Sequence, residues 1–468
     1  MNAKMGGLIM KSRTLKSLLL CIVLVFAVIP GCSGKKNNPA STEYEYSDYV
    51  FNNDEAQYYM NKDAAAAETG YYYIAKSPVH TSSYKFLYYF DMVNKNSMPL
   101  CTKLNCAHND ASCDAYMSDD ECLSSYIWYY DQRIYMIERN SEKDILVSYD
   151  KTGRDKREGA VLSVDGRSVL STGRKACVSH GKLYYILAGE KSQFLYEVSL
   201  MEKDTPKLIK EYTSEYEIRE RLNLYAIGDC VYMTLVSGIT NDINNYIIEC
   251  IDISGGEPVR KFDYMADQAS IQGEIKDWGR YDSEGNFYFT SVSDDAYCIN
   301  KLNLETKKNA EIYTIDLSQD MGSREDYIEL CGFDGKYLYL YEMIDFSVKE
   351  NRQNYELENY LYIIDTDGKV ADTVKFNKNR EYAKENNVST NSASVIISVI
   401  GGDSRYLLVT FGDYCVSGVE MSKEDIDKYK EAYTNAMKQQ KTAGVCVVGA
   451  LDKAQIGTGT FEWINITP

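Results

Sequence analysis

The stretch GKLYYI at residues 181–186 and the strand-like run after it decide the fold, because this pattern occurs seven times along the chain. Each unit opens with a short turn, often at Gly or Asp, and continues with a strand that contains Tyr. A variable loop and a second strand with an acidic or polar end follow. The first strands lie at residues 70–74, 133–137, 181–186, 230–234, 285–289, 335–340 and 404–409. Their partner strands end at Asp91, Asp150, Ser199, Asp252, Asn303, Asp365 and Asp452.

The spacing of these units favours a β-propeller. Successive partner ends lie 59, 49, 53, 51, 62 and 87 residues apart, and a period of about 50 is typical of four-stranded propeller blades. We therefore predict an all-β, seven-bladed propeller, with six or eight blades as alternatives because the last interval holds an insertion. Further strands are predicted at residues 98–101, 207–212, 259–264, 310–315, 370–376 and 395–400, with a closing strand at 460–466.

The insertion in the last blade is predicted to contain one helix, at residues 422–437. Ser422 can cap it with Asp425 at the capping-box position, and Ile426, Tyr429 and Tyr433 follow at helical spacing. The helix either packs on the rim of the ring or binds a partner.

Composition agrees with a strand-rich globular domain. The 468 residues are 44% hydrophobic and 26% charged, which excludes extended disorder. They include 42 Tyr against 13 Phe and 3 Trp, and a flat ring with a polar tip packs well on a half-buried sheet.

The first 31 residues are typical of a secretory signal. They contain no acid and carry Lys4, Lys11, Arg13 and Lys16 ahead of an apolar run at residues 18–29 that is too short for an ordinary membrane span. The sequence Ile-Pro-Gly-Cys that ends at Cys32 resembles the lipobox of bacterial lipoproteins, in which the cysteine receives diacylglycerol and becomes the new N-terminus. A plain signal peptide is the alternative.

This resemblance sets the predicted organisation and location. We expect a lipoprotein signal peptide at 1–31, a flexible tether at 32–60 and the propeller at 61–468, with a lipid anchor on the extracytoplasmic face of a bacterial cell membrane. Removal of four cationic residues from the 51 Lys and Arg leaves 47 against 69 acids, a net charge near −22. A protein with this negative charge repels nucleic acid, so a nucleic-acid partner is not expected.

A cysteine cluster interrupts the repeats after the first blade. Cys101, Cys106, His108 and Cys113 can place three thiolates and one imidazole around a tetrahedral structural zinc ion. The three cysteines and Cys122 can instead form two disulfides, as an oxidising extracellular location favours. In either case the cluster is predicted to occupy the connection from the first blade to the second.

The stretch from Leu100 to Tyr116 resembles a motif in uncharacterised surface lipoproteins of anaerobic Gram-positive bacteria. Those proteins also join a lipobox to Tyr-rich, propeller-like repeats, so the resemblance covers nearly the whole chain but implies no established activity. The repeats also resemble TolB-like and low-density-lipoprotein-receptor propellers in architecture.

No catalytic constellation stands out, so we predict no catalytic residues and name no ligand-binding residues. The sequence lacks G-x-S-x-G, H-E-x-x-H and glycine-rich phosphate loops. An interaction module for a glycan, a peptide or an envelope protein is the first hypothesis. The alternatives are an extracytoplasmic hydrolase or lyase with carboxylates at the central channel, and a structural protein of envelope assembly.

Overall fold

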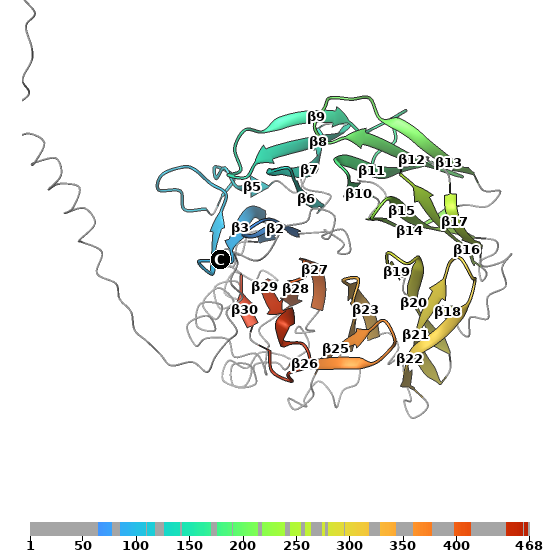
Figure 1. The fold of residues 1–468 in the computed structure, drawn as a ribbon. Coiled ribbons are helices and arrows are strands. Elements are labelled where there is room, and N and C mark those ends of the chain that lie inside the picture. Colours follow the sequence, from blue (N-terminus) through green and yellow to red (C-terminus); the bar gives the residue numbers. More distant parts are fainter. Residues whose placement is uncertain are drawn as a thin grey trace, which may run out of the picture. The chain divides into compact units, whose positions relative to one another are not determined.

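In the computed structural model, the unit at Val50–Pro468 is a seven-bladed β-propeller whose antiparallel sheets follow one another around a ring (Figure 1). Met1–Tyr49 is divided from it as a separate unit. Among the described residues, no helix is long and apolar enough to cross a membrane. The structure describes residues 64–76, 85–108, 110–117, 126–140, 143–169, 176–189, 191–213, 218–238, 244–253, 258–263, 274–276, 279–293, 295–317, 328–342, 359–376, 397–412, 446–461 and 463–466.

The first three blades run from the inner to the outer strand in chain order (Figure 1). Blade one contains β1 (Ala64–Ala66), β2 (Gly70–Lys76), β3 (Lys85–Asp91) and β4 (Asn96–Pro99), and the short β5 (Tyr116–Met117) also pairs with β3. Blade two contains β6 (Ile127–Tyr130), β7 (Arg133–Asn140), β8 (Lys143–Asp150) and β9 (Arg157–Val161). Blade three contains β10 (Ala176–Ser179), β11 (Lys182–Ala188), β12 (Ser192–Ser199) and β13 (Lys207–Thr213).

The other four blades repeat this order. Blade four contains β14 (Ile218–Ile227), β15 (Cys230–Gly238), β16 (Asn244–Asp252) and β17 (Pro258–Asp263). Blade five contains the inner strands β18 (Glu274–Ile275) and β19 (Arg280–Tyr281), then β20 (Asn286–Ser293), β21 (Ala296–Asn303) and β22 (Asn309–Asp316). Blade six contains β23 (Ile328–Phe333), β24 (Tyr337–Glu342), β25 (Asn359–Asp365) and β26 (Val370–Phe376). Blade seven contains β27 (Ile397–Gly402), β28 (Tyr406–Gly412), β29 (Cys446–Asp452), the 3-10 turn η6 (Lys453–Gln455) and β30 (Trp463–Asn465).

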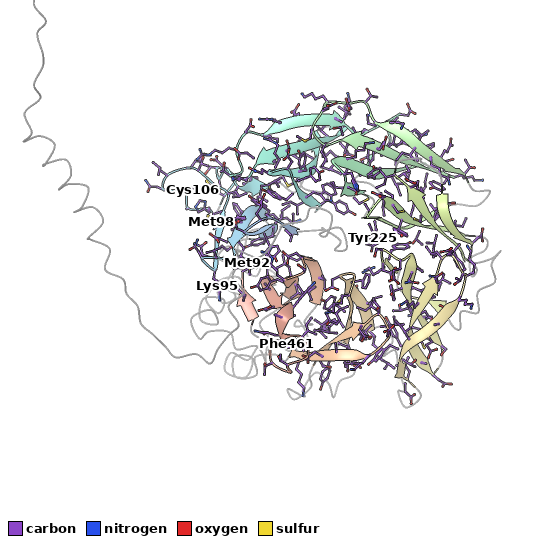
Figure 2. The ribbon with its side chains drawn as sticks, in the orientation of Figure 1. Met92, Lys95, Met98, Cys106, Tyr225 and Phe461 are labelled. Carbon is purple, nitrogen blue, oxygen red and sulfur yellow. The ribbon has the colours of Figure 1, made fainter. Side chains whose placement is uncertain are left out.

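The hydrophobic core lies between neighbouring blades, where the side chains of adjacent sheets meet (Figure 2). Successive side chains of a strand point to opposite faces of its sheet. In β11, Tyr185 therefore packs in the core shared with blade two, while Tyr184 packs in the core shared with blade four. Because both faces of a blade are covered, adjacent apolar residues can be buried together, and the strands contain Tyr-Tyr and Leu-Leu pairs as well as alternating patterns.

The ring closes through packing between blades one and seven. A Cβ atom placed on Gly401 of β27 would lie 3.2 Å from Cβ of Ala64 in β1. The hydroxyl of Tyr73 in β2 donates a hydrogen bond of 2.5 Å to the carbonyl of Ile466, just after β30. The described part of blade seven comes entirely from the C-terminal side of the chain, so the first and last blades meet as complete sheets.

The strand pattern predicted from the repeats is confirmed in all seven blades. The third strands end at the predicted residues, from Asp91 in β3 to Asp452 in β29. The segment predicted to close the ring, at 460–466, contains β30, the outer strand of blade seven. The outer strand β9 was not predicted, and the predicted helix at 422–437 lies outside the described residues.

Candidate metal centre

The cysteine loop interrupts the outer edge of blade one. Leu100, directly after β4, donates its amide N–H to the carbonyl of Leu87 at 2.9 Å, and Leu87 donates its own N–H to the carbonyl of Ala115 at 2.8 Å. The chain therefore leaves the edge of β3 and returns to it at the same residue. We call residues 101–114 the metal loop. As predicted, the cluster lies in the connection from the outer strand of blade one to the first strand of blade two, and within this connection the short β5 also pairs with β3.

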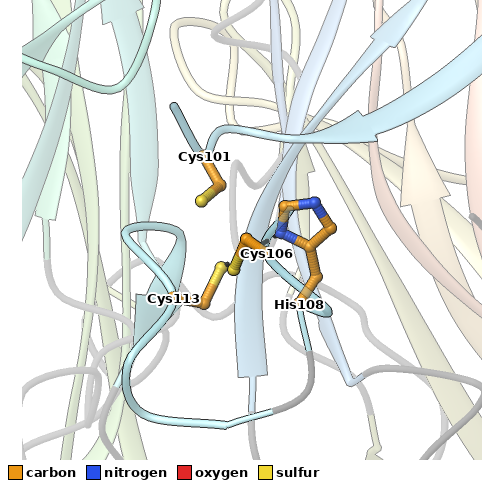
Figure 3. A group of neighbouring side chains, drawn as sticks. All are labelled: Cys101, Cys106, His108 and Cys113. Atoms are coloured by element: carbon orange, nitrogen blue, oxygen red, sulfur yellow. Dashed lines mark hydrogen bonds between the residues drawn. The ribbon is translucent and has the colours of Figure 1, made fainter. Parts of the chain in front are cut away.

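The metal loop brings the four predicted side chains together (Figure 3). One candidate ligand atom from each of Cys101, Cys106, His108 and Cys113 lies within 4.8 Å of all the others. Zn–S bonds of about 2.3 Å place the corners of a tetrahedral site about 3.8 Å apart, so these atoms are close to the spacing that one ion needs. The cysteines are free thiols, and Cys113 is buried while the other three residues are half-buried.

The imidazole of His108 faces the sulfur atoms with one particular nitrogen. Its Nδ1 lies 3.4 Å from Sγ of Cys113, and Figure 3 shows the other ring nitrogen pointing away from the cluster. The backbone of His108 is left-handed, with φ of 49°, as is that of Asn105, with φ of 60°. Asn and His tolerate this conformation better than most residues, and here it turns the loop sharply between two of the candidate ligands.

Backbone N–H groups point at two of the sulfur atoms, but they lower the net pKa of only one of the two thiols. Burial alone raises the pKa of the Cys101 thiol, but N–H groups of Lys103 and Asp114 and the neighbouring thiols lower it more, so the net pKa is depressed. Burial raises the pKa of the Cys113 thiol to about 12 although the Ala115 N–H stabilises its thiolate. A metal ion would therefore have to displace a proton from Cys113, which is the usual coupling of thiolate ligation to deprotonation.

An ion pair spans the base of the metal loop. Nζ of Lys103 lies 2.8 Å from Oδ1 of Asp114 and also donates a hydrogen bond to the carbonyl of Ser112. Oγ1 of Thr102 donates to Oδ2 of Asp114 at 3.1 Å. A Zn²⁺ ion with three thiolates and a neutral imidazole carries one negative charge, which the Lys103 ammonium would offset. The spacing of the candidate ligands in the sequence did not predict the ion pair of Lys103 and Asp114, because the two residues meet only when the end of the loop folds back onto its beginning.

The remaining predicted site residues lie elsewhere. Cys32, the predicted lipid site, and Cys122, a candidate disulfide partner, are both outside the described residues. His180, for which no site role is predicted, belongs to the turn between β10 and β11, where its Nδ1 lies 2.8 Å from Oγ of Ser179. Among the predicted site residues that the structure describes, the four that lie together are Cys101, Cys106, His108 and Cys113.

Comparison with known proteins provides no family assignment. No known protein family matches the chain, and no curated protein sequence matches it. Among solved structures, TolB from Acinetobacter baumannii has 11% identity and a TM-score of 0.35, with 64% of this chain and 62% of TolB covered. The WD40 domain of Toxoplasma gondii coronin has 11% identity and a TM-score of 0.38, with coverages of 75% and 71%. Dipeptidyl peptidase 4 from Porphyromonas gingivalis has 8% identity and a TM-score of 0.38, with coverages of 85% and 51%. The chain thus spans less than two thirds of TolB.

Proposed function

We propose that this protein is a lipid-anchored β-propeller on the extracytoplasmic face of a bacterial membrane, where it acts as an interaction module. Its ligand would be a glycan, a peptide or an envelope protein. The closed ring of seven sheets carries this proposal, because a rigid scaffold presents the loops between its strands as a binding surface. The basic and apolar residues before Cys32 support the anchor, and a net charge of −18 disfavours nucleic acid.

Within this module, we assign a structural zinc ion to Cys101, Cys106, His108 and Cys113. Three thiolates and one imidazole form a tetrahedral shell with no open position, which is typical of structural zinc. The described residues of the metal loop contain neither strand nor helix, so the ion would supply the order that a hydrophobic core supplies elsewhere. Two disulfides that include Cys122 are the competing arrangement.

Elemental analysis of the full chain tests the zinc assignment. We expect about one zinc per chain, and Co²⁺ in its place should give the absorption of a tetrahedral thiolate site. Cys106→Ser should lose most of the bound metal, whereas Cys230→Ser, at a half-buried position in blade four, should keep it. Metal-free protein with disulfides among the loop cysteines would overturn the assignment.

Labelling in a bacterial host tests the anchor. The full chain should incorporate labelled palmitate and sediment with membranes, whereas Cys32→Ser should lose the label because the thiol that receives the lipid is gone. An unlabelled wild-type chain in the medium would show a plain signal peptide instead.

Co-sedimentation tests the interaction role. The detergent-purified full chain should bind at least one of three isolated envelope fractions: peptidoglycan, wall polysaccharide or solubilised membrane protein. Heat-unfolded chain is the control, since the binding surface depends on the folded ring. Turnover of peptide or glycan substrates without retention would favour the hydrolase or lyase alternative, and neither retention nor turnover would contradict the interaction role.

A further inference from the structure

A cavity of about 380 Å³ lies between blades two and three and shares no residue with the metal loop. Its volume is within the usual range for small-molecule sites, about 300 to 1,000 Å³. The base is formed by the buried side chains of Tyr135, Ser148 and Leu200. Its remaining wall and mouth are formed by Arg133, Arg157, Glu158, Gly159, Met201, Glu202 and Lys203.

Strand register explains why these side chains meet. Tyr135 of β7 pairs with Ser148 of β8, and Ser148 pairs with Arg157 of β9. Arg133 lies two residues before Tyr135 and so projects from the same face of the sheet. The turn that begins with Leu200, directly after β12 of blade three, completes the cavity from the other side.

One carboxylate holds two guanidinium groups side by side. Oδ2 of Asp155 lies 3.0 Å from Nη1 of Arg133 and 2.5 Å from Nη2 of Arg157. Nε of Arg133 also donates to Oγ of Ser148 at 3.1 Å, which fixes this guanidinium against the sheet. Asp155 has a left-handed backbone, with φ of 45°, which is uncommon for a residue other than glycine. The turn is thus built around a pair of arginines, which bind planar oxyanions well.

Further hydrogen-bond donors reach the cavity without a protein partner. The Tyr135 side chain is 1% exposed, and its hydroxyl has no hydrogen-bond partner among the described residues. Lys203, at the mouth, forms no ion pair within the same residues. Because Tyr135 lines the cavity and its hydroxyl is not among the fully buried oxygen atoms, a polar ligand group or an ordered water in the cavity can form a hydrogen bond with it.

We propose that this cavity binds a ligand with a single carboxylate and neighbouring hydroxyl or amide donors. Arg157, Lys203 and the Tyr135 hydroxyl would bind the carboxylate. Glu158 and Glu202 would accept hydrogen bonds from the donors, and their charge would disfavour phosphate-rich polyanions. A peptide C-terminus and an acidic sugar both have this chemistry. The inference rests on the proposed interaction role and names its ligand class.

Calorimetry with matched pairs of probes tests the ligand class on the full chain in detergent. One pair is D-glucuronic acid and D-glucose, and the other is N-acetyl-alanyl-alanine and its C-terminal amide. At least one acid should bind about tenfold or more tightly than its neutral partner, because only the acid offers charge-assisted hydrogen bonds to Arg157 and Lys203. The pair that responds identifies the sugar or the peptide as the source of the carboxylate.

Two variants and a control locate the binding. Arg157→Gln changes an exposed side chain and should weaken the acid about tenfold without unfolding the chain. Tyr135→Phe should weaken it as well, whereas Lys369→Gln, at an exposed turn of blade six, should not. The proposal would be overturned if each acid bound no more tightly than its neutral partner, or if no acid bound below about 10 mM. It would also be overturned if Arg157→Gln bound the acid with the affinity of the wild type. If the chain then still binds an envelope fraction, the interaction role stands and only the cavity assignment fails.

Discussion

At the scale of single residues, tyrosine hydroxyls meet carboxylates at the turns that lead into the second strand of a blade. Tyr288 donates to Asp282 at 2.9 Å, and Tyr339 donates to Asp334 at 2.6 Å. The same carboxylates accept backbone N–H groups of their own turns, so each Tyr ties a strand to its turn. The largest fully buried side chains of the described residues are all Tyr, from Tyr71 to Tyr341. The excess of Tyr over Phe is therefore largely structural.

Asp334 also links two blades, and its removal should destabilise the ring. Its carboxylate is buried and forms an ion pair with Lys453 of blade seven, in addition to the hydrogen bond from Tyr339. Asp334→Asn leaves the Lys453 ammonium without its counter-charge in a buried place, which should cost about 3 kcal/mol of unfolding free energy. Denaturant unfolding measures this, and Asp367→Asn at an exposed hairpin tip is the control. An equal stability of Asp334→Asn and wild type would contradict the pair's role.

The same pair predicts a dependence on acid. Burial raises the pKa of Asp334, but the charge and hydrogen bond of Lys453 and the hydrogen bonds from Tyr339 and the Tyr337 N–H lower it more, so the folded-state pKa is depressed. Stability from this carboxylate is therefore complete above its unfolded pKa of about 3.9 and is lost as pH falls through the lower folded value. The stability difference between wild type and Asp334→Asn should shrink below about pH 4. A difference that is constant from pH 7 to pH 3 would show that Asp334 does not titrate in this way.

Lys103 should strengthen zinc binding although it is not a ligand. Lys103→Met removes the ammonium that offsets the thiolate charge and bridges Asp114 and Ser112, so zinc affinity should fall about tenfold. Competition with a chromophoric chelator measures the affinity. Lys103→Arg should restore most of it because the charge returns, and Lys95→Met in an exposed turn of the same blade should leave it unchanged. Unaltered zinc affinity in Lys103→Met would show that the ion pair does not contribute to zinc binding.

At the scale of elements, local signals predicted most strand ends. Oδ1 of Asp150 accepts the N–H of Thr152 at 2.9 Å, and Oδ1 of Asp365 accepts that of Asp367 at 3.0 Å, so acids that end a strand form its turn. Cysteine and histidine spacing likewise predicted which four residues meet. The interruption of the blade-one edge was not predictable, because it depends on hydrogen bonds to Leu87 from both ends of the metal loop. Strand β9 was missed because it is mostly exposed and lacks an apolar pattern.

The metal loop should be removable as a unit. Deletion of residues 101–114 joins Leu100 to Ala115, which already share Leu87 as their hydrogen-bonding partner. Two residues opposite one is the arrangement of a β-bulge, which sheet edges accommodate. The shortened chain should therefore keep its far-ultraviolet circular dichroism and a melting temperature within a few degrees of the zinc-free wild type, while zinc content falls to zero. Loss of the folded state would show that the loop contributes to the core of blade one.

At the scale of the whole molecule, each blade buries its faces only against its neighbours, so closure completes the core. Separate hydrophobic clusters lie between blades one and two, two and three, three and four, four and five, and five and six. Such stepwise packing makes stability a sum of interfaces, and an open ring would leave two blade faces in water. The period in the sequence predicted the repeated blades, but the contact between blades one and seven depends on curvature accumulated over the whole ring.

Closure predicts that a residue near the end of the chain behaves as a core residue. Ile466, just after β30, is fully buried, and its carbonyl accepts the hydrogen bond from Tyr73 across the closure. Ile466→Ala should therefore cost about 2 to 4 kcal/mol, because it removes buried methyl groups and leaves a cavity next to the backbone that bonds Tyr73 of blade one. Ile134→Ala, at an equally buried site in the core of blades one and two, is the matched reference. Denaturant unfolding of both variants makes the comparison: similar losses show that closure is as tight as an interior interface, whereas wild-type stability of Ile466→Ala would show that the terminal strand frays and the ring does not depend on it.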